Sequence, residues 1–227
     1  KTYRFSGPIK ELALAVNHRK AKLAWQILQD PEQSIVSVVE DDPVEHIQRH
    51  YQGYIQQIKR SSDPVVAFAE FSKFQVLAAV RQGPQGVEGL NQALEKRLQV
   101  QNIATHHTWY HGRPVMIRRN DPALGLFNGD IGLCLYDAEV GQMRVWFEQS
   151  DGSLRPVMPG RLPDHETVYV MTIHKSQGSE FAHVMIVLPL QNSPLLSREL
   201  LYTAITRAKE KVDIAAPSAI FMRTVHQ

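Results

Sequence analysis

Apolar residues recur at helical spacing between residues 7 and 30, and a proline at position 31 ends the stretch. This spacing predicts helices that pack one apolar face against a core. The stripe consists of Ile9, Leu12, Leu14, Ala15, Leu23, Ile27 and Leu28. The next apolar run, SIVSVVED, predicts a short buried strand.

A polar segment from Pro43 to Ser62 has the composition of an exposed helix. Another helix is predicted to start directly afterwards, because Asp63 is a good N-cap residue and Pro64 is favoured at the first helical position. This helix runs to Phe71, and the apolar run FQVLAAV that follows it predicts a buried strand.

The helical periodicity disappears after Gly112, where short alternating runs take over. The runs PVMIR, IGLCLY, MRVWFE and LRPVM are typical of half-buried strands. Turn-forming residues separate them at Asn128-Gly129, Gly141 and Asp151-Gly152. Short strands at this spacing predict a small antiparallel barrel of about five strands over residues 113–163.

Continuous apolar runs return after the predicted barrel. The runs TVYVMTI and HVMIVLP are nearly uninterrupted, as expected of parallel strands that are buried on both faces. SRELLYTAITRAKE has helical spacing, and KVDIAA predicts a third strand. The sequence therefore predicts an α/β fold in which residues 1–112 and 164–227 form a parallel sheet flanked by helices. The barrel of residues 113–163 is then an insertion within this domain.

Composition restricts the kinds of site that the chain can contain. Its one cysteine, Cys134, excludes an internal disulfide and a zinc cluster of thiolates, and fits a reducing compartment. No cysteine or carboxylate accompanies His106, His107 and His111 at ligand spacing, so no metal site is expected. The chain shows neither a signal peptide at its start nor a membrane-length apolar run, which predicts an intracellular, cytoplasmic protein without a membrane partner.

Charge is nearly balanced over the whole chain, with 25 basic and 23 acidic residues. A nucleic-acid contact would therefore need a local basic groove. The visible basic clusters are Arg113, Arg118 and Arg119, and the pair Lys209 and Lys211. Such clusters are also common as solvated faces, so both interpretations stay open.

The polar segment HKSQGSE directly follows a predicted buried strand, over residues 174–180. Ligands of open parallel sheets bind at the carboxyl ends of the strands, which is where we expect this loop. Gly178 would let the backbone approach a phosphate closely, and Glu180 would accept hydrogen bonds from a ribose. The alternative is an ordinary polar connection between a strand and the next element.

The predicted helix that starts after Ser197, a plausible N-cap, places Arg207 beside Thr203 at the margin of its apolar stripe. A long side chain in that position can pack its stem and extend its guanidinium into a cleft. A planar, permanently charged guanidinium suits the spread charge of a phosphoryl group in transfer. The alternative is an arginine that forms a salt bridge with a neighbour.

Both of these segments resemble signatures of superfamily-one DNA helicases, in the version found in RecD, the alpha subunit of exodeoxyribonuclease V. TIHKSQGSEF resembles motif V, and LLYTAITRAK resembles motif VI. Three further segments resemble the family in the same order: YRF the start of motif IV, VLAAVRQGPQGVEGLN the segment after it, and NDPALGLFNGDIG the start of an SH3-like insertion. The resemblance covers nearly the whole chain and implies a RecA-like parallel sheet with an inserted SH3-like β-barrel.

The resemblance also implies roles for individual residues. Arg4 and Arg207 would approach the γ-phosphate of ATP from across a cleft, and Gly178 and Glu180 would border the nucleotide. The expected contacts to single-stranded DNA are Thr172, His174, Lys175, Asn128 and Arg118. Trp109, Tyr110 and His111 are candidate partners for stacking with bases, although aromatic core packing is the alternative.

The same family has a phosphate loop, and this sequence contains no G-x-x-x-x-G-K-[ST] motif. The acidic cluster of residues 40–42 follows the motif IV resemblance, which is the wrong order for a Walker B segment. The resemblance implies that a preceding motor domain supplies most phosphate and Mg²⁺ ligands, and that this chain alone hydrolyses little ATP.

The resemblance implies that the parent enzyme translocates along DNA, driven by ATP hydrolysis. The expectation is 5′ to 3′ movement with RecB- and RecC-like subunits, in double-strand-break repair and recombination. Two alternatives stay open, namely a non-catalytic module that binds nucleic acid or protein, and a superfamily-one helicase of relaxase or phage type.

Overall fold

A computed structural model describes residues 7–103 and 107–227, and these residues fall into two compact units. The first unit contains residues up to 50, residues 72–90 and residues 170–227, and the second contains residues 51–71 and 91–169. The second unit thus includes helices from before residue 113 in addition to the strands of the predicted barrel. The predicted boundaries at residues 112 and 164 stay a prediction.

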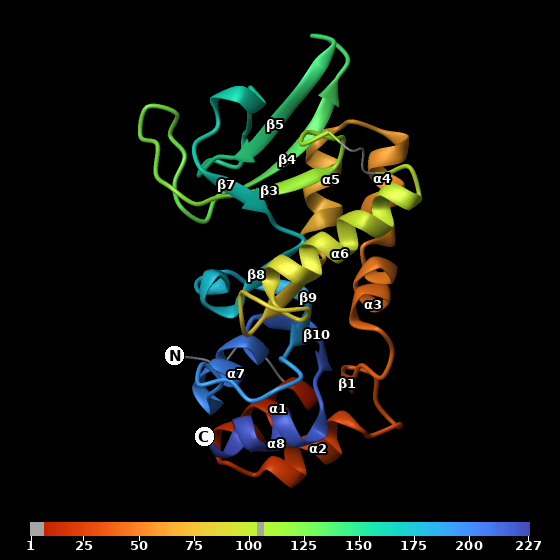
Figure 1. The fold of residues 1–227 in the computed structure, drawn as a ribbon, viewed down its shortest axis with the longest axis vertical. Helices are drawn as coiled ribbons and strands as arrows, with labels where there is room; N and C mark the ends of the chain where they lie inside the picture. The colour runs from red at the N-terminus through yellow and green to blue at the C-terminus, as the bar shows by residue number, and fades with distance from the viewer. Residues whose placement is uncertain (1–6, 104–106) are drawn as a thin grey trace. The chain divides into compact units, whose positions relative to one another are not determined.

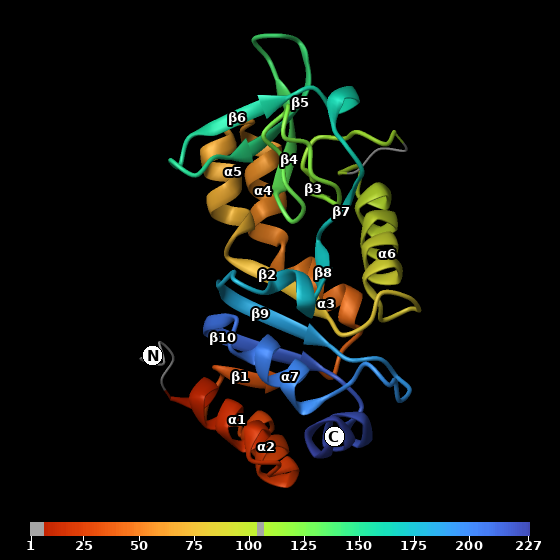
Figure 2. The same cartoon turned by 90° about the vertical axis from the view of Figure 1, so that its left-hand side faces the viewer.

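The first unit is built on a five-stranded parallel sheet in the order β1-β10-β9-β2-β8 (Figure 2). Its strands are β1 (Val36–Val38), β2 (Phe74–Ala78), β8 (Val170–Thr172), β9 (Phe181–Val187) and β10 (Ala208–Ala215). Every residue of β2 is buried, as are the last four of β9. The predicted parallel sheet is therefore confirmed, and its strands have the continuous apolar character of a doubly covered sheet.

Helices cover both sides of this sheet, with α7 and α3 on opposite sides of β9 and β10 (Figures 1 and 2). The helices of the unit are α1 (Pro8–Asn17), α2 (Ala21–Leu28), α3 (Pro43–His50), α7 (Arg198–Ile205) and α8 (Ser218–His226), with the short 3-10 helix η2 (Ile173–Ser176). Leu12 and Val16 are fully buried on α1. Leu14 and Leu23 were expected in the same stripe and are instead exposed, at 45% and 43%.

The polar segment after Pro43 is not one exposed helix, and that prediction is wrong. It forms α3 and α4 (Gln52–Arg60), which are separate helices on either side of Tyr51. Tyr51, Tyr54 and Ile58 are buried, and the Tyr54 hydroxyl donates to the carbonyl of Gly112 at 2.9 Å. Their helical spacing defines an apolar stripe that the polar composition of the segment conceals.

The second unit contains a five-stranded antiparallel sheet in the order β6-β5-β4-β3-β7. Its strands are β3 (Arg113–Ile117), β4 (Ile131–Asp137), β5 (Gln142–Glu148), β6 (Leu154–Val157) and β7 (His165–Thr167), and its helices are α4, α5 (Pro64–Phe71) and most of α6 (Val87–Val100), with the 3-10 helix η1 (Pro159–Arg161). The four alternating runs are confirmed as strands. Closure of this sheet into an SH3-like barrel stays a prediction.

The run TVYVMTI was expected to be one strand, and the structure divides it between two sheets. Thr167 pairs with Val115 as the end of antiparallel β7, whereas Val170 pairs with Val76 at the start of parallel β8. A continuous apolar run shows that a segment is buried, and does not show which partner strand each residue has.

The predicted helix over residues 197–210 is too long. Helix α7 ends at Ile205, and β10 begins at Ala208. Ala208 pairs with Phe181 in the sheet, and the Phe181 backbone N–H donates to the carbonyl of Arg207 at 2.9 Å. The ladder with β9 therefore overrides the helical propensity of the RAKE segment. Across the described residues, each helix is too short or too polar to span a bilayer.

Candidate functional site

The loop between β8 and β9 is anchored at its start by short-range hydrogen bonds. The Thr172 hydroxyl accepts from the backbone N–H of Lys175 at 3.3 Å and caps η2. The Ser176 hydroxyl, which is fully buried, donates to the carbonyl of Ile173 at 2.6 Å. This anchoring brings Thr172, His174 and Lys175 together at the carboxyl end of β8, with His174 exposed.

The loop then passes through Gly178, which has a φ of +90°. A Cβ at this position would meet no heavy atom within 4 Å, so the glycine is required by backbone conformation and not by crowding. Beyond it the chain reaches Phe181, where β9 begins.

Since β8 and β9 are parallel, the loop must start at the carboxyl edge of the sheet and finish at the amino edge. Placement of the whole loop at the carboxyl ends was expected and is wrong for Ser179 and Glu180. These two residues lie next to the start of β9.

Arg207 lies in the short connection between α7 and β10, and not on the helix as predicted. Its Nε donates to the carbonyl of Thr203 at 3.3 Å, and its Nη1 donates to the carbonyl of Ser179 at 3.2 Å. The guanidinium therefore joins the end of α7 to the end of the β8–β9 loop. Within the described part of the chain Arg207 forms no ion pair with a carboxylate, which does not fit the salt-bridge alternative.

The start of α7 agrees with the prediction. The Ser197 hydroxyl accepts from the backbone N–H of Leu200 at 3.1 Å, so Ser197 is the N-cap. Leu200, Leu201, Ala204 and Ile205 form the buried stripe. This packing fixes the end of α7 from which Arg207 extends.

Glu180 is partly exposed and lies 3.5 Å from Nζ of Lys209, the second residue of β10. An exposed ion pair of this kind contributes little to stability, so the carboxylate can exchange this partner for another. The structure thus gathers Glu180 and Arg207 at the amino edge of β9 and β10, and Gly178 precedes Glu180 by two residues in the same loop. Arg4 lies outside the described residues.

A pocket of about 330 Å³ lies at the opposite edge of the sheet, beyond the carboxyl ends of β2 and β9. It is lined by Val80, Gln82, Gly83, Pro84, Gln85, Gly86, Pro189, Leu190 and Gln191. A Cβ on Gly86 would approach the carbonyl oxygen of Gln82 to 2.4 Å, so the turn requires glycine there. Sequence reasoning gave these residues no role, although a glycine-rich turn directly after a buried strand was a usable signal.

Two of the predicted DNA contacts, Arg118 and Asn128, belong to the second unit. Arg118 is exposed, and its Nε lies 3.8 Å from a carboxylate oxygen of Asp164. The backbone N–H of Asn128 donates to the side-chain oxygen of Asn120 at 2.8 Å, which holds the turn before β4. Both side chains keep the exposure that a contact with a phosphate backbone needs.

Of the expected basic cluster Arg113, Arg118 and Arg119, the last two are exposed, whereas Arg113 is not part of the surface. Arg113 is buried, and its guanidinium donates to the Thr167 hydroxyl at 3.1 Å and to the carbonyl of Thr108 at 3.0 Å. It also lies over the ring of Trp109, 4.9 Å from the ring centroid. In the ladder of β3 and β4, Arg113 lies opposite the buried Cys134.

The aromatic residues before β3 have structural contacts. Tyr110 is buried and donates to a carboxylate oxygen of Glu95 at 2.7 Å, and burial raises the pKa of its hydroxyl well above the usual range. His111 Nε2 donates to the carbonyl of Ile58 at 2.7 Å, because its Nδ1 accepts from the backbone N–H of Tyr136. Base stacking by Tyr110 is therefore ruled out as long as the fold is intact, and core packing is its role.

Known proteins similar to this chain agree with the resemblance of its motifs. The model of the UvrD-like helicase C-terminal domain matches residues 167–214, the segment that includes the β8–β9 loop and Arg207. The RecBCD enzyme subunit RecD of Haemophilus influenzae is 41% identical over 161 residues, which are 70% of this chain and 24% of that protein. The RecD subunit of Mycolicibacterium smegmatis is 35% identical over 222 residues, which are 96% of this chain and 39% of that protein.

Among solved structures, Bacteroides Pif1 bound to single-stranded DNA has a similar fold, with a TM-score of 0.52 at 14% identity. The likeness covers 97% of this chain and 52% of the Pif1 chain, and it concerns the fold alone. The present chain spans less than two fifths of the length of the RecD relatives described above. The resemblance to RecD is confirmed, and the chain corresponds to the C-terminal motor half of a superfamily-one DNA helicase.

Proposed function

We propose that the protein containing this chain hydrolyses ATP in a cleft between two RecA-like domains and uses the closure of that cleft to move 5′ to 3′ along single-stranded DNA. This chain supplies one wall of the cleft, and a phosphate loop and Walker B carboxylates on another domain supply the opposite wall. The Mg²⁺ that accompanies ATP neutralises charge on the phosphate oxygens.

The observation that carries the proposal is the position of the Arg207 guanidinium. It bonds the carbonyl of Ser179 and the carbonyl of Thr203, and a guanidinium has more N–H donors than these two bonds use. The remaining donors can meet γ-phosphate oxygens whose charge increases during transfer. Glu180 on the same edge and Gly178, two residues before it in the loop, border the nucleotide, and Arg4 adds a second guanidinium.

The β8–β9 loop gives a physical route for coupling ATP to DNA. One end carries Thr172, His174 and Lys175 at the carboxyl end of β8, and the other end bonds Arg207 through Ser179. When Arg207 moves on release of the γ-phosphate, it therefore displaces the β8–β9 loop, which is the segment that contacts the DNA backbone. Contacts of this kind tolerate any base sequence, because they involve phosphates and base stacking.

The relatives support the proposed setting, since they are named as RecD subunits of the RecBCD enzyme. We place the parent protein with RecB- and RecC-like subunits in cytoplasmic double-strand-break repair and recombination. The antiparallel sheet of the second unit would be the SH3-like insertion, with Arg118 and Asn128 as its DNA contacts.

The test is the DNA-stimulated ATPase rate of the full-length protein with Arg207→Ala. Loss of an arginine that stabilises phosphoryl transfer reduces kcat by roughly 10³-fold or more. The matched control is Arg223→Ala on α8, where the arginine is exposed and lies outside the proposed cleft. We expect the control to keep the wild-type rate, and a normal kcat in folded Arg207→Ala protein would contradict the proposal.

A further inference from the structure

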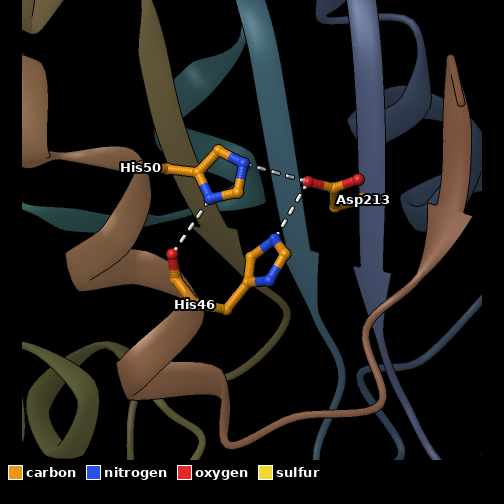
Figure 3. Close-up of side chains that lie close together, drawn as sticks. All are labelled: His46, His50 and Asp213. Atoms are coloured by element: carbon orange, nitrogen blue, oxygen red, sulfur yellow. Dashed lines mark hydrogen bonds and ion pairs between the residues drawn. The ribbon is translucent and has the colours of Figure 1, made fainter.

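Several polar side chains converge on the carboxylate of Asp213, on the α3 side of the parallel sheet, and Nζ of Lys211 lies 3.7 Å from its Oδ1. Asp213 lies on β10 and is fully buried. Its Oδ2 lies 3.0 Å from Nε2 of His46 and 2.7 Å from Nε2 of His183, and the Ser37 hydroxyl donates to its Oδ1 at 2.6 Å. Figure 3 shows that His46 and a further imidazole, His50, both face this carboxylate from α3.

The hydrogen bond made by the other nitrogen of His50 identifies its tautomer. His50 Nδ1 lies 3.0 Å from the backbone carbonyl of His46, and a carbonyl only accepts, so Nδ1 carries the proton. Nε2 of the neutral ring then has a free lone pair, which faces Asp213 Oδ2 at 3.8 Å. Two electron-rich atoms that face one another in a largely buried place would both attract a cation that entered between them.

This is also the arrangement of a metal-binding histidine. Such residues donate one ring N–H to a backbone carbonyl or carboxylate, which directs the lone pair of the other nitrogen at the ion. His46 and His50 are four residues apart on α3, a spacing that places both imidazoles on one face of a helix.

The distances fit a zinc ion. Zn–N and Zn–O bonds of about 2.0–2.2 Å in a tetrahedron place neighbouring ligand atoms about 3.3 Å apart. The ligand atoms of His46 and His50 are 3.0 and 3.8 Å from Asp213 Oδ2, and all three atoms lie within 4.8 Å of one another. The distance between the two histidine nitrogens has to shorten by at most about 1.5 Å to reach this spacing.

We propose that His46 Nε2, His50 Nε2 and Asp213 Oδ2 form a zinc site, with His183 and Ser37 orienting the carboxylate. Imidazole nitrogen and carboxylate oxygen are a donor set that Zn²⁺ accepts, and water completes the tetrahedron. Ligation also needs the Nε2 lone pair of His46, so the proton that Nε2 shares with Asp213 moves through solvent to Nδ1, and the ring stays neutral. The two histidine side chains are 13% and 22% exposed, which leaves a path for the ion.

The site would tie α3 to β10 directly before Tyr51, the residue at which the chain passes from the first unit to the second. The inference does not depend on the proposed helicase activity. No metal site was expected from the His106, His107 and His111 group, and ligands from segments 167 residues apart give no local ligand spacing in the sequence.

The test measures Zn²⁺ binding to the full-length protein after dialysis against a chelator, in competition with a chromophoric chelator. His50→Gln removes one ligand and leaves the bonds from His46, His183 and Ser37 to Asp213 intact, so we expect it to fold. The matched control is His226→Gln, the same substitution at the exposed end of α8. His46→Gln is a second ligand variant, and circular dichroism checks the fold of each.

We expect wild-type protein and His226→Gln to bind one more equivalent of Zn²⁺ than His50→Gln and His46→Gln, or to bind it at least about 100-fold more tightly. Co²⁺ bound to the wild type should show the intense visible bands of tetrahedral coordination, and these bands should be lost in His50→Gln. Equal Zn²⁺ binding by folded wild type and His50→Gln, or wild-type protein without tetrahedral Co²⁺ bands, would overturn the proposal.

Discussion

Replacing Gly178 with alanine should lower the DNA-stimulated kcat of ATP hydrolysis, while the protein stays folded. A φ of +90° is costly for alanine, by about 1–2 kcal/mol, because its Cβ approaches the neighbouring carbonyl. Nothing surrounds the new methyl group within 4 Å, so the loop is free to relax into another conformation. Relaxation would move the carbonyl of Ser179 away from Nη1 of Arg207, which now lies 3.2 Å from it.

The expected magnitude follows from this energy, since 1–2 kcal/mol corresponds to a factor of roughly 5–30 in population. We therefore expect Gly178→Ala to lower the DNA-stimulated kcat about 5–30-fold in the full-length protein. The control is Gly152→Ala, where φ is +81° and nothing lies within 4 Å, in the turn between β5 and β6. Both variants face the same backbone cost, so equal kcat values for the two would refute the reasoning.

Two further predictions concern DNA binding and stability. Lys175→Ala should weaken binding of single-stranded DNA and reduce the slope of log K against log salt concentration by about 0.7, as expected for one lost phosphate contact. Fluorescence anisotropy at several salt concentrations measures this slope, and an unchanged slope would exclude the contact. Ser197→Ala should lower the free energy of unfolding, measured by urea denaturation, by about 1 kcal/mol, because it removes the N-cap hydrogen bond to the backbone N–H of Leu200. Ser218→Ala is the control, as α8 has no side-chain cap, and equal effects of the two substitutions would contradict this role of Ser197.

Local features were predictable from sequence where a residue acts on its near neighbours. Ser197 caps α7, and Asp63 accepts from the backbone N–H of Val65 at 2.9 Å, as their positions before apolar helices predict. The strands of the parallel sheet were equally visible, because burial on both faces leaves continuous apolar runs.

Features set by distant pairing were not predictable in the same way. The end of α7 depends on Ala208 pairing with Phe181, and helical propensity carries no information on that partner. The position of Ser179 and Glu180 depends on the parallel order of strands, which sends the loop to the amino edge. Asp213 meets His46 only because the fold brings α3 onto β10.

The central claim is that Arg207, through the β8–β9 loop, couples the bound nucleotide to the affinity of the protein for single-stranded DNA. The direct measurement is the Kd of the full-length protein for single-stranded DNA, with and without a non-hydrolysable ATP analogue, in wild type and in Arg207→Ala. For the wild type, we expect the Kd values with and without the analogue to differ at least about fivefold, which is the lower end of the usual coupling between two sites. For Arg207→Ala, we expect the ratio of the two Kd values to be near one. An Arg207→Ala protein that keeps the wild-type ratio would contradict the account.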